Sequence, residues 1–293
     1  MFSLVLLKLK LKFCLIPRYD KEITRHFLKI VPAFAMAGIF VKIYNTSDSV
    51  LLGYLDSDTA VGFFAVPAKI VYALQQIIPA AFAAVIFPAF SFYYINSKKL
   101  LAQTFNKAFT YLTIISLPIS AGLVVLAPQI IRLVWPTYIE VVPTFIVMGL
   151  AIPFIFLAFP TGYLLNACDR QKNTTINRGI ITALAVILNI ILIPRLSFFG
   201  AGITFLITNF VLLFLDFFWV KSVISLNPLV LLKIVFKSLL ASIIMIIGIY
   251  LVKPYFHLLI IIPWGALIYF ISLYMLKGFS LIEVRELVRK GLK

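Results

Sequence analysis

Charged residues are scarce in this sequence. Only 12% of its 293 residues are Asp, Glu, Lys or Arg, whereas 63% are hydrophobic, and the mean hydropathy is +1.10. A soluble domain carries roughly a quarter charged residues, because its surface must face water. The scarcity therefore excludes an ordinary soluble domain and indicates a protein whose outer surface faces lipid.

Alternation of polar and apolar residues is also missing. Transmembrane barrels need this alternation, but runs such as "TFLITNFVLLFLDFFWV" do not show it. A helix needs about 20 apolar residues to cross the hydrocarbon core. We therefore expect an all-α, polytopic transmembrane helix bundle with about eight spans, at residues 28–55, 61–93, 101–126, 142–167, 175–195, 199–221, 233–252 and 256–277.

Acidic residues are few, so the 26 Lys and Arg give a net charge of +16. Most of these basic residues flank alternate ends of the expected spans, and the opposite links hold only Arg132, Arg195 and Lys253. Cytoplasmic loops of membrane proteins are enriched in Lys and Arg. We therefore expect both termini to be cytoplasmic, in a multi-pass protein of the inner (cytoplasmic) membrane. This topology accounts for the charge without nucleic acid as a partner.

The chain divides into three parts. Residues 1–27 form a basic cytoplasmic lead-in, and their apolar stretch is too short to span a membrane. They lack a basic segment before that stretch and a small-residue cleavage site after it, which argues against a signal peptide. Residues 28–277 form the transmembrane bundle. Residues 278–293 form a basic amphipathic tail suited to an anionic membrane surface.

Signatures of catalysis and of metal binding are missing as well. The two cysteines, Cys14 and Cys168, are isolated in sequence, so no disulfide framework or metal-ligand spacing follows. No Walker A loop and no nucleophile elbow occur. The links on the outer side are too short to hold a folded domain. We expect a protein that is not an enzyme and uses no cofactor or metal.

Polar residues inside the first two expected spans form two stripes at helical spacing. Ionisable residues at membrane depth cost free energy, so they usually face a cavity or a partner. We expect the two stripes to line one cavity, with these members: Lys42, Asn45, Asp48, Ser49, Lys69, Tyr72 and Gln76. A structural role remains open for each of them, because Asp48 can pair with a lysine and Lys69 can extend to the interface.

Three further polar residues lie in later spans. Asn189 and Asn209 are expected to form hydrogen bonds between helices. Asp216 lies near the cytoplasmic end of the sixth span, where we expect solvent or Lys221 as its partner. The segment "PTYIEVVP" predicts a short interfacial helix, and the prolines of the second span predict a kink.

Several segments resemble one family of exporters. They are "YNTSDSVLLGYLDSDTAVGFFAVPAKI", "IIPAAFAAVIFPAFS", "LAPQIIRLVWPTYIEVVPTFIVMGLAIPF" and "LLNACDRQKNTTINRGIITALAVILNIILIPRLSFFGAGITFLITN". In order and spacing, from Pro32 to Leu276, they are similar to polysaccharide or O-antigen flippases. These flippases are a branch of the multidrug/oligosaccharidyl-lipid/polysaccharide (MOP) exporter superfamily.

The resemblance implies transport of a lipid-linked oligosaccharide across the cytoplasmic membrane by alternating access, with Lys42, Asp48 and Lys69 at cavity-lining positions. Members of the family have twelve to fourteen spans in two lobes, and the match is to the second, MATE-like lobe. It implies that residues before 28 contain the end of a preceding span. We therefore expect a fragment, a truncated gene or half of a split transporter, with an N-terminal lobe or a second subunit as a possible partner.

Three alternatives stay open. A multidrug or small-cation antiporter of the same superfamily would favour carboxylates in its cavity, whereas lysines outnumber them here. A membrane glycosyltransferase or polymerase would need acidic residues on large outer loops, which this chain lacks. A truncated remnant that transports nothing is compatible with the sequence.

Overall fold

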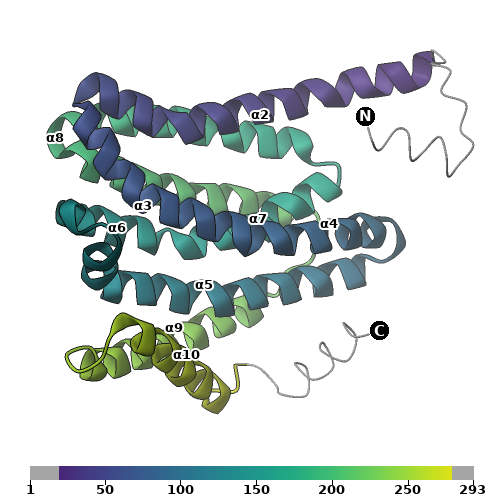
Figure 1. Ribbon diagram of the computed structural model, residues 1–293. Helices are drawn as coiled ribbons and strands as arrows, with labels where there is room; N and C mark the ends of the chain where they lie inside the picture. Colours follow the sequence, from purple (N-terminus) through teal and green to yellow (C-terminus); the bar gives the residue numbers. More distant parts are fainter. Residues whose placement is uncertain (1–19, 279–293) are drawn as a thin grey trace, which may run out of the picture.

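The computed structural model describes residues 20–278, and within this range it contains helices and turns but no strand (Figure 1). The helices are α2 (Lys21–Leu55), α3 (Asp58–Ile77), α4 (Pro79–Asn96), α5 (Lys98–Val134), the 3-10 helix η1 (Pro136–Val141), α6 (Val142–Leu150), α7 (Ile152–Ala167), α8 (Gln171–Val220), α9 (Pro228–Val252) and α10 (Leu258–Met275). The all-α prediction is confirmed. The tail after Gly278 and residues 1–19 of the lead-in lie outside the described residues.

The described part of the chain contains six helical stretches that are long and apolar enough to cross a membrane. They are Asp58–Asn96, Lys98–Val134, Pro136–Ala167, Gln171–Val220, Pro228–Val252 and Leu258–Met275. The chain is therefore a multi-pass membrane protein. The eight expected ranges nevertheless lie on helices. Helix α8 reverses direction and covers two of them, and α2, which is not among the six stretches, covers another. The number of crossings and the side of each terminus remain predictions.

The second expected span contains the predicted kink. Helix α3 ends at Ile77, and α4 begins at Pro79. Proline has no N–H group, so the carbonyl of Gln75 loses the donor that a continuous helix would supply. The interruption therefore lies beside Gln75 and Gln76, in the middle of an apolar span. The expected short helix after Trp135 is present as η1.

Helix α8 folds back on itself at Ser197, whose φ of 53° and ψ of −139° are not helical. Two details fix this reversal. A Cβ at Gly200 would lie 2.7 Å from the carbonyl oxygen of Leu192, so the close approach of the two halves requires glycine. Ser197 Oγ also donates a hydrogen bond to Asp56 Oδ2, which ties the reversal to the α2–α3 turn.

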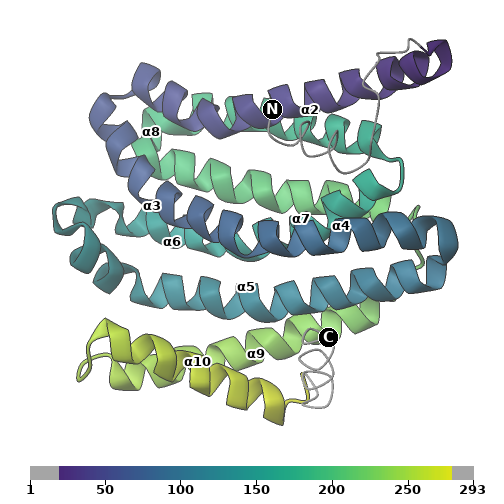
Figure 2. The same cartoon turned by 45° about the vertical axis from the view of Figure 1, so that its right-hand side comes forward.

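The helices are arranged with α2 at one edge, against α8, and the α9–α10 pair at the opposite edge, against α5 (Figures 1 and 2). The largest apolar core joins α3, α5, α7 and α8, with Phe64, Phe105 and Phe156 buried in it. A second core fixes α9 and α10 on α5, where Tyr269 Oη donates a 2.8 Å hydrogen bond to the carbonyl of Ile114. Both views show α2 and α3–α4 diverging from their common turn. This divergence leaves parts of α7 and α8 to form the floor between them.

Candidate functional site

A cavity of about 420 Å³ lies where α2 and α3 diverge above α7 and α8. Its wall runs from the α7–α8 turn to the middle of the second half of α8. Apolar atoms come mainly from α2 and α7. The polar lining residues are Gln75, Tyr163, Asn166, Gln171, Thr174, Thr175, Arg178 and Asn209. This mixture of polar groups is unusual for the inside of an apolar bundle, and it marks the cavity as the candidate site.

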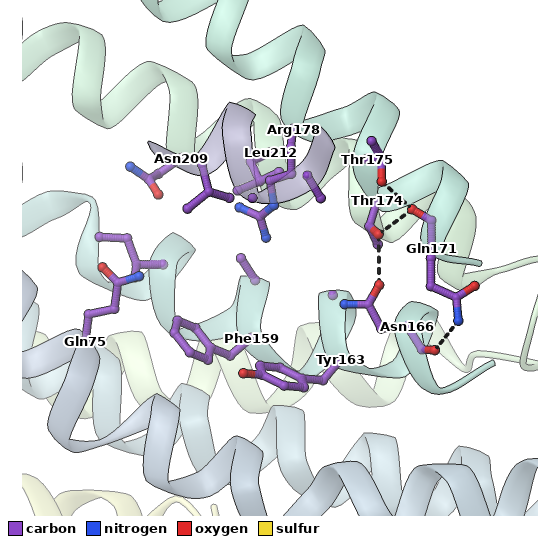
Figure 3. A pocket seen from close by; sticks show the side chains of 16 residues that line it. Gln75, Phe159, Tyr163, Asn166, Gln171, Thr174, Thr175, Arg178, Asn209 and Leu212 are labelled. Atoms are coloured by element: carbon purple, nitrogen blue, oxygen red, sulfur yellow. Dashed lines mark hydrogen bonds between the residues drawn. The ribbon is translucent and has the colours of Figure 1, made fainter. Parts of the chain in front are cut away.

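Arg178 is the cation of this cavity. It lies seven residues after the first residue of α8, about 10 Å along the helix axis at 1.5 Å per residue. Figure 3 shows its side chain directed into the cavity, with Phe159 and Tyr163 on the facing wall. Among the described residues, the guanidinium of Arg178 has neither a hydrogen-bond acceptor nor an ion-pair partner. Its donors are therefore available to an anionic group in the cavity.

Gly162 on α7 lies next to this guanidinium. A Cβ at residue 162 would lie 3.7 Å from Nη2 of Arg178 and 3.7 Å from Oδ2 of Asp216. A larger side chain there would occupy the space between the two charged groups. Two residues from the two halves of α8 thus approach the same point on α7.

A network of neutral side chains closes one end of the cavity (Figure 3). Thr174 Oγ1 lies 2.8 Å from both Asn166 Oδ1 and the carbonyl oxygen of Gln171. Gln171 Nε2 donates to the carbonyl of Asn166 at 3.1 Å, and the hydroxyl of Thr175 donates to the carbonyl of Gln171 at 2.9 Å. These bonds fasten the end of α7 to the start of α8 beside the exposed Arg170. The end of the cavity nearest the basic turn is therefore polar, and hydrogen bonds join its side chains.

Asp216 lies behind Arg178 in the second half of α8. Its side chain is fully buried, Oδ1 accepts a 2.8 Å hydrogen bond from Asn177 Nδ2, and Oδ2 has no partner. The prediction of solvent or Lys221 as its partner is wrong. The reversal at Ser197 lays the first half of α8 over Asp216, so Asn177 takes that place, and Lys221 is exposed.

A smaller hollow of about 90 Å³ adjoins the cavity and shares Gln75, Arg178 and Asn209 with it. Two of the predicted cavity residues, Asn45 and Tyr72, line this hollow. It lies against a buried polar cluster between α2 and α8. Tyr44 Oη lies 2.8 Å from Thr208 Oγ1 and accepts a 3.1 Å hydrogen bond from Asn209 Nδ2.

The other predicted cavity residues lie outside both linings. Lys42, Lys69 and Gln76 are exposed, and Ser49 is half-buried. Asp48 is buried and accepts a 2.6 Å hydrogen bond from Asn189 Nδ2. A cavity that includes a further lobe would involve the exposed face of α2 and α3. The role of these residues therefore remains a prediction.

The predicted hydrogen bonds between helices are confirmed for Asn189 and Asn209, since both reach side chains on α2. Arg178 is not among the predicted cavity residues, because its position near a span end made it one of the topology-setting charges. A signal was present, however. Gln171, Thr174, Arg178 and Thr182 follow one another at intervals of three or four residues, which places them on one helical face.

The chemistry of the cavity suits a molecule that joins an anionic group to hydrogen-bonding groups. The planar guanidinium fork matches phosphate geometry, and its attraction for an anion is stronger away from bulk water. Amides and hydroxyls supply neutral donors and acceptors for polar substituents. Within residues 20–278, no group of three or more His, Cys, Asp or Glu is placed to hold a metal ion.

Three comparisons with known proteins are informative at this point. The sequence profile of a family described as "Polysaccharide biosynthesis protein" matches residues 1–143. An uncharacterized membrane protein of Methanocaldococcus jannaschii, MJ1068, is 25% identical over 298 residues, which cover 94% of this chain and 57% of that protein. A structure of the lipid II flippase MurJ in an inward closed conformation aligns with a TM-score of 0.72 at 21% identity. This alignment covers 98% of this chain and 59% of MurJ.

The chain therefore spans less than two thirds of the length of both relatives. The likeness to MurJ shows a shared fold along almost the whole chain. The family profile adds a sequence match that includes α2, α3, α4 and α5. The profile, which matches about half of the chain, and the shared fold both agree with the resemblance found in the sequence.

Proposed function

We propose that this chain forms the second lobe of a transporter that carries a lipid-linked oligosaccharide across the cytoplasmic membrane by alternating access. The family profile and the flippase fold support the transport class. The observation that carries the proposal is the unpaired guanidinium of Arg178 inside a polar cavity of the bundle. Among the described residues Arg178 interacts electrostatically with Asp216 but forms no hydrogen bond and no ion pair through its guanidinium, so its donors are free for a ligand.

The cavity matches the parts of such a substrate. The phosphate that links a sugar to its lipid is anionic, and Arg178 can bind it through paired N–H donors. The amides and hydroxyls around Arg178 can bind sugar hydroxyls, and Phe159 and Tyr163 can pack against sugar rings. The lining begins at the α7–α8 turn beside Arg170, so the proposed entry is from the side where the basic residues gather.

In this proposal the protein is a carrier and not an enzyme. A second lobe, on a separate chain or elsewhere in a longer one, would meet the exposed face of α2 and α3. Lys42 and Lys69 lie on exposed parts of these helices, where they would face the shared pathway. Movement of the two lobes would then open the pathway to each side of the membrane in turn.

The proposal can be tested by measuring polysaccharide at the surface of cells that lack the gene for this chain. The cells are complemented with wild type, Arg178→Gln, Arg178→Lys or Lys172→Gln, at matched protein levels in the membrane. A charge-assisted hydrogen bond contributes about 1.5–3 kcal/mol, so Arg178→Gln should lower export about tenfold or more. Arg178→Lys should restore part of it.

Lys172→Gln is the matched control, because it removes one exposed positive charge from the same end of α8. Export with this variant should stay near the wild-type level. The proposal would be wrong if Arg178→Gln exported as much polysaccharide as wild type.

A further inference from the structure

We propose that Asp216 is a proton-accepting counter-charge for Arg178, so that an anionic group entering the cavity is accompanied by one proton taken up at Asp216. This inference rests on the proposed function in one respect, namely that the cavity receives an anionic group. It assigns the uptake of the proton to a carboxylate that does not touch the ligand itself.

The first support is the incomplete hydrogen bonding of Asp216. The side chain is fully buried, Asn177 binds one carboxylate oxygen, and the other oxygen has no partner. An ionised carboxylate in such a place is costly unless a cation compensates it. The unpartnered Oδ2 therefore needs either a positive charge or a proton.

The second support is the position of Arg178. It follows Asn177 directly in the chain, and its Nη2 and the Oδ2 of Asp216 both lie 3.7 Å from the vacant Cβ position of Gly162. The two groups form no hydrogen bond and no ion pair with each other. Arg178 is thus close enough to stabilise the negative charge of Asp216, but it forms no direct bond with that carboxylate.

The surroundings offer no other compensating charge among the described residues. From the first half of α8, Asn177 and Arg178 face Asp216. From α7, Gly162 contributes no side chain, and Tyr163 lines the cavity beyond it. The cavity wall on α2 consists of Ala37, Gly38 and Val41, which are uncharged.

One guanidinium cannot fully compensate two anions. When a phosphate in the cavity draws the guanidinium towards itself, Asp216 loses its compensation, and its Oδ2 takes up a proton that comes from the bulk solvent. One negative charge and one proton then enter together, so the buried charge stays balanced. Linkage is reciprocal, so a lower pH should tighten anion binding through Asp216.

The test is calorimetric titration of the purified full chain in nanodiscs with farnesyl diphosphate, and separately with inorganic pyrophosphate. Each titration is run at pH 7 in two buffers of different ionisation enthalpy, which gives the protons taken up per ligand bound. The variants are Asp216→Asn, Arg178→Gln and Asp169→Asn. Asp169 is an exposed carboxylate at the α7–α8 turn, so Asp169→Asn controls for a nearby loss of negative charge.

Wild type should take up about one proton more per ligand than Asp216→Asn, which subtracts the ionisation of the ligand itself. Asp216→Asn should still bind the probe, with a dissociation constant that changes less with pH. Asp169→Asn should match wild type, and Arg178→Gln should lose binding. Equal proton uptake in wild type and Asp216→Asn would overturn the inference.

The outcomes separate this inference from the proposed function. Binding by wild type without the extra proton overturns the inference and leaves the transport proposal standing. An extra proton that depends on Asp216, together with normal export by Arg178→Gln cells, supports the inference and overturns the transport proposal. If neither probe binds to wild type, the inference is overturned, and the export measurement decides the transport proposal by itself.

Discussion

Asn189 on α8 donates a 2.6 Å hydrogen bond to Asp48 on α2, and both side chains are buried. The two residues are 141 positions apart, so this bond joins two helices that are distant in the sequence. Asp48 is thus a residue that fastens the edge helix α2 to the bundle. Its carboxylate depends on this amide, which makes the pair a sensitive point for stability.

Replacement of Asn189 by Leu should lower the free energy of unfolding by about 2–3 kcal/mol, because it leaves the Asp48 carboxylate buried without its donor. The measurement is unfolding of the purified chain in detergent micelles. Asn45→Leu is the control, since Asn45 is exposed on α2, one turn before Asp48. An equal loss of stability in both variants would contradict the assigned role of Asn189.

Gly200→Ala should destabilise the bundle by about 1–3 kcal/mol, the usual cost of overpacking. The added Cβ would lie 2.7 Å from the carbonyl oxygen of Leu192 and would force apart the two halves of α8. Gly122→Ala on α5 meets nothing within 4 Å, so it should be neutral or slightly stabilising through its helix propensity. Thermal unfolding should shift to lower temperature for Gly200→Ala alone, and a similar loss in both variants would refute the packing argument.

The double substitution of Lys42 and Lys69 by Ala should reduce polysaccharide export severalfold without changing the stability of the chain. Both lysines are exposed, so their removal leaves the described core intact. Export is compared in cells with equal amounts of protein, and Lys107→Ala on α5 is the control for loss of an exposed lysine. Wild-type export by the double variant would remove these lysines from the proposed pathway.

Cys168, at the turn between α7 and α8, should react slowly with maleimides. Burial, followed by the negative charge of Asp169, raises the pKa of its thiol to about 12. The thiolate is the reactive form, so the alkylation rate of a Cys14→Ser variant should still rise with pH above pH 9. An ordinary thiol would already level off near that pH. A plateau near pH 9 would contradict the buried environment of Cys168.

Much of the fold follows from the sequence because the driving force is simple. Long apolar runs predict the helices, and turn residues predict the reversal between residues 195 and 199, which the structure places at Ser197. The ends of the helices follow less closely from the sequence. Helix α2 begins at Lys21 although its apolar run starts later, and α5 continues to Val134, beyond the predicted end at residue 126.

The site is harder to predict, because helical spacing does not tell which face meets which neighbour. Lys42 and Lys69 share stripes with Asn45 and Tyr72, yet only the latter two line a described cavity. Arg178 looked like a topology charge, and Asp216 looked accessible to solvent. The reversal of α8 decides both cases, because it brings the two halves of one helix together around the cavity.

The most direct measurement of the central claim is photo-crosslinking in native membranes. The probe is a polyprenyl diphosphate oligosaccharide with a photoreactive group beside the diphosphate, and the labelled peptides are mapped by mass spectrometry. We expect labels on α7 and the first half of α8 around Gly162 and Arg178, and we expect them to be lost in Arg178→Gln and kept in Lys172→Gln. Labels confined to the outer faces of the bundle, or unchanged by Arg178→Gln, would contradict the central claim.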